Sequence, residues 1–169
     1  LCYYPFWQSL FYPAFFAYDD GLNWDEIIPS GIAQYIWGGA ILFFYTIYSL
    51  ATVCLGIRFS NLTYRGLVTN GPYRFTKHPA YVTKNIAWWL VSMPFISHIS
   101  LGSAITCTVA LMGISTIYFI RARTEERHLS NYPEYVEYAL AMNERSIFAP
   151  LAKRFTFLQY KKPLVLPKI

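Results

Sequence analysis

The chain has 169 residues, enough for one domain, but 55% of them are hydrophobic, 20% are aromatic and only 14% are charged. A soluble globular domain has about 25% charged residues, so this composition excludes an ordinary soluble domain and favours one that is solvated by lipid. The net charge of +5 does not indicate a nucleic-acid partner, because the basic residues flank apolar segments. We expect the lipid bilayer to be a partner and nucleic acid not to be one.

Residues 1–18 are apolar and aromatic, with Pro5 and Pro13 inside the run. The chain begins with Leu1 and has no basic n-region, so we expect a partial transmembrane segment whose N-terminus is truncated, and not a signal peptide. The acidic stretch Asp19–Glu26 follows this segment.

Two further segments are free of Asp, Glu, Lys and Arg, namely 27–57 and 85–120. About 20 apolar residues cross the hydrocarbon of a bilayer, so 27–57 predicts one transmembrane helix. The second segment is too long for one span and contains Pro94. It predicts a transmembrane hairpin with a turn at Ser97–Gly102.

Basic residues gather in the connection 58–84 and again directly after Ile120. The positive-inside rule places both clusters in the cytosol, and two crossings by the hairpin agree with that placement. The C-terminal region 121–169 is therefore expected to be cytosolic. It contains an amphipathic pattern from Leu129 to Ala139 and a tail, 155–169, that we expect to be extended or disordered.

The predicted fold is thus all-α and integral to the membrane, in a single domain over 1–169. It is a bundle of about four transmembrane helices with a C-terminal helical hairpin and a cytosolic amphipathic helix. The three cysteines, Cys2, Cys54 and Cys107, lack metal-ligand spacing, so no metal site is predicted.

Two motifs carry the candidate chemistry, GPYRFTKHPAY (Gly71–Tyr81) and RARTEE (Arg121–Glu126). Taken singly, the Tyr, Arg and Lys side chains are typical interfacial anchors and positive-inside residues. The adjacent carboxylates Glu125 and Glu126 are harder to explain by topology, since lipid-facing surfaces reject them. Salt bridges to the arginines are an equally simple reading of that pair.

In this order, and separated by a hairpin, the two motifs resemble the isoprenylcysteine carboxyl methyltransferase and phospholipid methyltransferase superfamily. The resemblance runs from Leu67 to about Tyr138. It implies S-adenosylmethionine as cofactor, in a cytosolic pocket built from the His-Pro segment and the acidic pair. The cofactor-binding residues implied by position are Tyr73, His78, Pro79, Tyr81, Glu125 and Glu126.

The Arg-x-Arg before the acidic pair resembles the carboxyl methyltransferase branch, which implies that Arg121 and Arg123 orient a substrate carboxylate. With Glu126 they form the implied catalytic set. Lys77 stands where the family usually has Arg and Thr83 where Gly is common, so the substrate branch stays open.

Methyl transfer is an in-line displacement that requires alignment and exclusion of water more than a dedicated nucleophile. The leading hypothesis is transfer of a methyl group to a membrane-partitioned carboxylate or amine at the cytosolic interface. One alternative is an NADPH-dependent oxidoreductase of the steroid-reductase type, against which the adjacent glutamates argue. The other is a non-enzymatic membrane subunit. The sequence does not indicate an oligomeric state.

Overall fold

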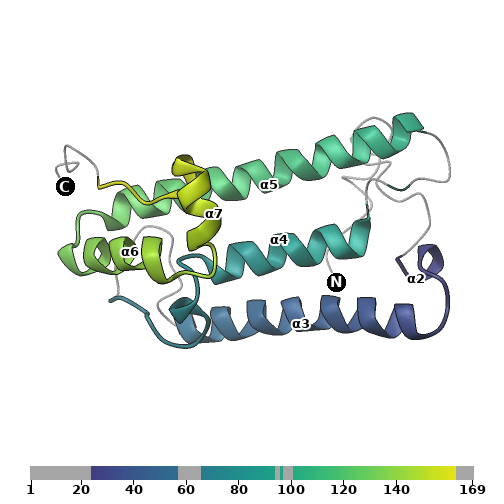
Figure 1. The fold of residues 1–169 in the computed structure, drawn as a ribbon, viewed down its shortest axis with the longest axis horizontal. Coiled ribbons are helices and arrows are strands. Elements are labelled where there is room, and N and C mark those ends of the chain that lie inside the picture. The colour runs from purple at the N-terminus through teal and green to yellow at the C-terminus, as the bar shows by residue number, and fades with distance from the viewer. Residues whose placement is uncertain (1–23, 57–65, 94–95, 97–100, 163–169) are drawn as a thin grey trace, which may run out of the picture. The chain divides into compact units, whose positions relative to one another are not determined.

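The computed structural model describes residues 24–56, 66–93, 96 and 101–162, and within these ranges all regular elements are helical (Figure 1). The all-α class is confirmed. The predicted span at 1–18 lies outside the described residues. In chain order the elements are α2 (Trp24–Ile27), α3 (Ile32–Leu55), η2 (Gly71–Arg74), α4 (Pro79–Ser92), α5 (Leu101–Leu129), α6 (Pro133–Arg145), α7 (Ala149–Arg154) and η3 (Thr156–Leu158).

Among the described residues, α3 and α5 are long and apolar enough to cross a membrane, each with a mean hydropathy of 1.7. Their 24 and 29 residues exceed the length of about 20 residues that the hydrocarbon requires. Only 6% and 11% of their most apolar stretches are buried, unlike the core helices of soluble domains. Many large apolar side chains of α3 are instead exposed, for example Ile32 at 79%, although Ile41 is buried.

Helix α3 is shorter than the uncharged run 27–57 that predicts it. Pro29 and Gly31 separate α2 from α3, and Gly31 has a φ of +113°, a conformation that L side chains rarely adopt. The first regular turn of α3 therefore begins only at Ile32.

The helices found in the region of the predicted hairpin, 85–120, begin earlier and end later than those bounds. Helix α4 starts at Pro79, before the predicted boundary at residue 85, and its 14 residues give about 21 Å of helix. This is less than one bilayer span, so α4 alone is no candidate for crossing. Most of the predicted turn, residues 97–100, lies outside the described ranges, and the number of crossings stays a prediction. Helix α5 continues past Ile120 to Leu129, so the RARTEE motif is helical.

The chain forms two compact units, and each of the helices α3, α4 and α5 contributes to both. Unit 1 comprises Leu1–Leu42 and Asn85–Ile117, and unit 2 comprises Phe43–Lys84 and Tyr118–Ile169. In unit 1, two indole N–H groups join the helices. Trp37 Nε1 donates to the carbonyl of Leu90 at 3.0 Å, and Trp89 Nε1 donates to Ser115 Oγ at 3.1 Å. These bonds satisfy donors in an apolar setting.

The core of unit 2 is built around α6, which turns back beside the last turns of α5 (Figure 1). Helix α6 begins at Pro133, a residue suited to a first helical position because it lacks an N–H. Its buried face carries Tyr135, Ala139 and Met142, spaced as neighbours on one side of a helix. The predicted amphipathic helix therefore exists, although it starts after Leu129.

The expectation of an extended or disordered tail over 155–169 is wrong for residues 156–158, which form η3, whereas the backbone at Gln159 is extended as expected. The side chain of Tyr160 is only 4% exposed, packed with Tyr135 and Ala139. Residues 163–169 lie outside the described ranges.

The backbone at Gly71, the first residue of η2, generates a prediction. Its φ is +58°, and a Cβ there would come within 2.8 Å of Cys54 Sγ. Gly71→Ala should therefore cost about 2 kcal/mol and lower the thermal midpoint in detergent by about 4–8 °C. Gly39→Ala is the matched control, since nothing lies within 4 Å of that position in α3. An unchanged midpoint for Gly71→Ala would contradict the described turn.

Candidate functional site

The junction of His78 and Pro79 fixes where α4 begins. Pro79 is the first helical residue and is fully buried. Two hydrogen bonds form the first turn of α4. Val82 N–H donates to the carbonyl of His78 at 3.1 Å, and Thr83 Oγ1 donates to the carbonyl of Pro79 at 2.8 Å. Because proline restricts the residue before it, His78 is held at the non-helical edge of α4. Pro79 thus constrains the backbone that carries the imidazole.

The acidic pair lies in the last turns of α5, which ends at Leu129. Carboxylates near the C-terminus of a helix are unfavourable to the helix dipole, so cations are needed to compensate them. Arg123 supplies one from the same helix, because its guanidinium lies 2.8 Å from Glu126 Oε2 across a spacing of three residues.

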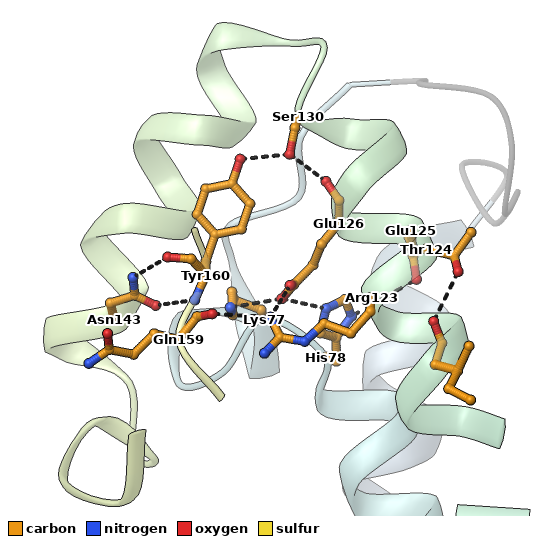
Figure 2. Close-up of polar contacts among 11 residues, drawn as sticks. Lys77, His78, Arg123, Thr124, Glu125, Glu126, Ser130, Asn143, Gln159 and Tyr160 are labelled. Atoms are coloured by element: carbon orange, nitrogen blue, oxygen red, sulfur yellow. Dashed lines mark hydrogen bonds and ion pairs between the residues drawn. The ribbon is translucent and has the colours of Figure 1, made fainter. Parts of the chain in front are cut away.

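Glu126 is the centre of a buried ion cluster, which Figure 2 shows. Its Oε1 lies 2.7 Å from Lys77 Nζ and 3.1 Å from His78 Nε2, and its Oε2 receives Arg123. The side chains of Glu126 and Lys77 are only 7% and 12% exposed. We call Lys77, His78, Arg123 and Glu126 the Glu126 cluster.

The Glu126 cluster lies beyond the uncharged stretch of α5, which ends at Ile120. Burial acts to raise the pKa of Glu126, but the hydrogen bond and charge of His78 and the charge of Lys77 outweigh it and hold the pKa at about 2. Burial lowers the pKa of Lys77, and Glu126 opposes that change. Glu126 is therefore ionised and already paired, and it presents no vacant carboxylate.

Glu125 is in a different situation. Its side chain is 28% exposed, and its carboxylate lies 3.9 Å from His78 Nδ1, so the imidazole stands between the two glutamates. The Tyr81 ring stacks on His78 with centroids 5.8 Å apart and an interplanar angle of 17°. Burial and then the charge of Glu125 raise the pKa of Tyr81 to about 12, against the opposing charge of the exposed Arg121. Glu125 and Tyr81 thus both adjoin His78, and the charges of Glu125 and Arg121 both act on Tyr81.

Tyr73 takes no direct part in the Glu126 cluster. It is 8% exposed, and its carbonyl accepts a 2.7 Å hydrogen bond from Tyr138 Oη of α6. Burial, followed by the charge of Glu125, raises the pKa of its hydroxyl. Tyr73 therefore lies within electrostatic reach of Glu125 and helps to attach η2 to α6.

The tail contributes residues that the sequence reasoning missed. Arg123 also donates to the carbonyl of Gln159 at 3.1 Å, and Tyr160 Oη lies 2.6 Å from Ser130 Oγ, which donates to the carbonyl of Glu126 (Figure 2). Lys77 Nζ lies 5.5 Å from the centroid of the Tyr160 ring. No spacing or composition signal in the tail indicates these contacts.

Asn143 of α6 anchors the tail by its side-chain amide. Its Oδ1 accepts from the backbone N–H of Tyr160, and its Nδ2 donates to the Tyr160 carbonyl, both at 2.9 Å. The two bonds satisfy both backbone groups of a residue whose side chain is buried.

A cavity of about 410 Å³ lies between α5 and the tail. This volume is within the range of small-molecule sites. Its walls come from the end of α5 and from the tail segment 156–161. The lining residues are Arg123, Glu126, Arg127, Ser130, Thr156, Phe157, Gln159, Tyr160 and Lys161.

A group of at least three His, Cys, Asp or Glu side chains arranged to hold a metal ion is absent from the described part of the chain. The fit to S-adenosylmethionine rests on other groups. Its ammonium and sulfonium suit the partly exposed carboxylate of Glu125 and the ring of Tyr81. The structure thus brings His78, Tyr81, Glu125 and Glu126 together, while Arg123 is already committed to Glu126 and Gln159.

Glu126→Gln tests the Glu126 cluster. Removing the charge leaves Lys77 and Arg123 without their buried counter-ion, so we expect a loss of about 3 kcal/mol in the free energy of unfolding in detergent at neutral pH. The contribution of the carboxylate is full above its usual pKa of 4.5 and is lost as the pH falls towards about 2. The difference between wild type and variant should therefore shrink over that window.

Glu137→Gln is the control, because this exposed glutamate of α6 lies outside the cluster and should change stability by less than about 0.5 kcal/mol. Equal stability of wild type and Glu126→Gln at neutral pH would argue against the cluster.

Asn143→Leu tests the anchoring of the tail. The substitution leaves the N–H and carbonyl of Tyr160 unpaired, at a cost of about 1–3 kcal/mol each if they stay buried, so the tail should detach locally. Limited proteolysis should then cut at Arg154 and Lys161 faster than in wild type. Asn131→Leu, in the turn before α6, is the comparison variant and should leave the cleavage rate unchanged. Equal cleavage of wild type and Asn143→Leu would contradict the anchor.

The comparison with known protein families matches the part of the chain that contains both motifs. The model of the isoprenylcysteine carboxyl methyltransferase (ICMT) family matches residues 32–131, more than half of the chain. No curated protein and no solved structure matches. The matched range covers α3, the His-Pro segment and the acidic pair, and it confirms the resemblance expected from the two motifs. With the two apolar helices it indicates a membrane methyltransferase. The chain belongs to the isoprenylcysteine carboxyl methyltransferase family.

Proposed function

We propose that the protein transfers a methyl group from S-adenosylmethionine to a membrane-partitioned acceptor, at the cytosolic interface of a membrane that it crosses several times. The observation that carries the proposal is the position of His78 between Glu125 and Glu126, all within the range matched by the family. His78 and Glu126, which come from the two motifs and lie 48 residues apart in the chain, thereby join both motifs in one site.

Glu125 and Tyr81 are the groups proposed to hold the cofactor. S-adenosylmethionine supplies an activated methyl carbon when it is bound. The carboxylate of Glu125 is partly exposed and can accept hydrogen bonds from ammonium or hydroxyl groups, which are strongest when one partner is charged. The Tyr81 ring, stacked on His78, offers an aromatic face to a cation or to a flat base.

Glu126 is proposed as a positioning residue. It touches Lys77, His78 and Arg123, and its side chain is 7% exposed. Both of its carboxylate oxygens are therefore already paired with groups of the protein itself. By holding the imidazole it fixes the orientation of His78 and, through the ring stack, of Tyr81. A site held in place before the reaction loses less to reorganisation when methyl donor and acceptor must be aligned.

Calorimetry with the full chain in detergent tests the proposal. Wild type should bind S-adenosylmethionine, and Glu125→Gln should weaken binding about 10-fold or more, since a hydrogen bond to a charged group is worth about 1.5–3 kcal/mol. His78→Ala should weaken it comparably. Glu144→Gln, an exposed glutamate at the end of α6, is the matched control and should bind as wild type does.

The same instrument separates the alternatives. Binding of NADPH in place of S-adenosylmethionine would favour a steroid-reductase-like oxidoreductase, and binding of neither would favour a non-enzymatic subunit. Equal affinity of wild type and Glu125→Gln for S-adenosylmethionine, with both proteins folded by circular dichroism, would refute the assignment of Glu125.

A further inference from the structure

Helix α7 and the 3-10 helix η3 carry four large apolar side chains that the protein leaves exposed. They are Ile147, Leu151, Phe155 and Phe157, and we call them the C-terminal apolar surface. Ile147 and Phe157 are each 61% exposed. The buried residues of α7 are instead the small ones, Ala149 and Ala152. Exposed apolar residues that gather in this way mark a surface that contacts another protein or a membrane.

Backbone and ring contacts connect the members of the C-terminal apolar surface. Phe155 N–H donates to the carbonyl of Leu151 at 2.9 Å, so the two side chains lie about one helical turn apart. The rings of Phe155 and Phe157 pack edge to face with centroids 6.1 Å apart. At the other end, Ile147 N–H donates to the carbonyl of the exposed Phe75 at 3.0 Å. The surface therefore extends from η3 to the segment just before α4.

The C-terminal apolar surface is continuous with the apolar surface of α5. The ring of Phe157 packs edge to face against Phe119 of α5, with centroids 6.3 Å apart. Phe119 and its neighbour Ile120 are exposed at the end of the uncharged stretch of α5. Because α5 is long and apolar enough to cross a membrane, such exposed side chains face lipid. The C-terminal apolar surface thus begins where the lipid-facing surface of α5 ends.

The charges around the C-terminal apolar surface have one sign. From residue 145 to residue 162 the chain carries five basic residues and no acidic one, namely Arg145, Lys153, Arg154, Lys161 and Lys162. Lys153 and Arg154 lie in the last turn of α7, are exposed, and have no ion-pair partner among the described residues. Exposed cations beside aromatic and aliphatic side chains are typical of segments that lie in the interface of a membrane.

Two other occupants fit these charges less well. Helix α6 exposes Glu134, Glu137 and Glu144, so the basic character belongs to α7 and η3 and not to unit 2 as a whole. A second copy of the chain would bring Lys153 and Arg154 towards their own equivalents across a two-fold interface, where like charges repel. Anionic lipid headgroups attract these cations instead.

We infer that the C-terminal apolar surface inserts into the headgroup region of the membrane that α5 enters, and that Lys153 and Arg154 favour anionic lipids there. The inference is independent of the proposed methyl transfer, since it uses neither Glu125 nor Tyr81. Arg123 of the Glu126 cluster lies over the Phe119 ring, 5.3 Å from its centroid. Contact of the surface with lipid therefore places the Glu126 cluster beside the headgroups.

Fluorescence quenching of the full chain in lipid nanodiscs tests the insertion. A coumarin-bearing amino acid takes the place of Leu151 or, as the matched control, of Glu137, which is exposed on α6. Lipids with a nitroxide near the headgroup should quench the coumarin at position 151 and not at position 137, whereas aqueous iodide should do the reverse. Iodide quenching at 151 as strong as at 137 would mean that the surface faces water. Quenching at 151 by neither reagent would mean that protein covers it, and both results would overturn the inference.

The preference for anionic lipid is tested at position 151 in the same nanodiscs. Nitroxide-labelled phosphatidylserine should quench more strongly than labelled phosphatidylcholine, because one cation near an anionic surface favours it by a factor of about 5. The double variant Lys153→Gln, Arg154→Gln should lose this difference. Arg127→Gln removes an exposed cation of unit 2 outside α7 and η3, and it should keep the difference. An undiminished preference in the double variant, or an equal loss in Arg127→Gln, would overturn the role of the two cations.

Discussion

The buried carboxylate of Glu126 is the constraint on which the site in unit 2 depends. An ionised group with 7% exposure is tolerated only if opposite charges and hydrogen bonds replace its water. Its partners come from two places in the chain, Lys77 and His78 before α4 and Arg123 on α5. Satisfying one carboxylate therefore requires the His-Pro segment and α5 to be in place together.

The tail segment is also connected to Glu126, through Arg123 and Ser130. Arg123 pairs with Glu126 and with the carbonyl of Gln159, so one guanidinium connects the ion cluster to the segment that walls the cavity. Ser130 links the backbone of Glu126 to the hydroxyl of Tyr160 in the same way. The site and the cavity wall are thus stabilised by shared contacts, and a change at Arg123 affects both.

Much of the fold was predictable because it follows from local composition. Uncharged apolar runs predicted the regions of α3 and α5, and the spacing of apolar residues predicted α6. The two motifs predicted the family. The pairings of Lys77 with Glu126 and of Asn143 with Tyr160 were not predictable, because they join distant residues with no periodicity to reveal them. The separate roles of Glu125 and Glu126 also required the geometry, and cofactor binding by either remains a prediction.

The amide of Asn143 acts on Tyr160 as a neighbouring peptide group would, accepting from its N–H and donating to its carbonyl. Such a contact recognises main chain rather than side chains. Attachment of the tail is thereby separated from the identity of the neighbouring residues Gln159 and Lys161, which line the cavity. Substitutions at those two positions are free to retune what the cavity accepts while the wall stays attached, so this stretch is well placed for ligand preference to diverge between related proteins.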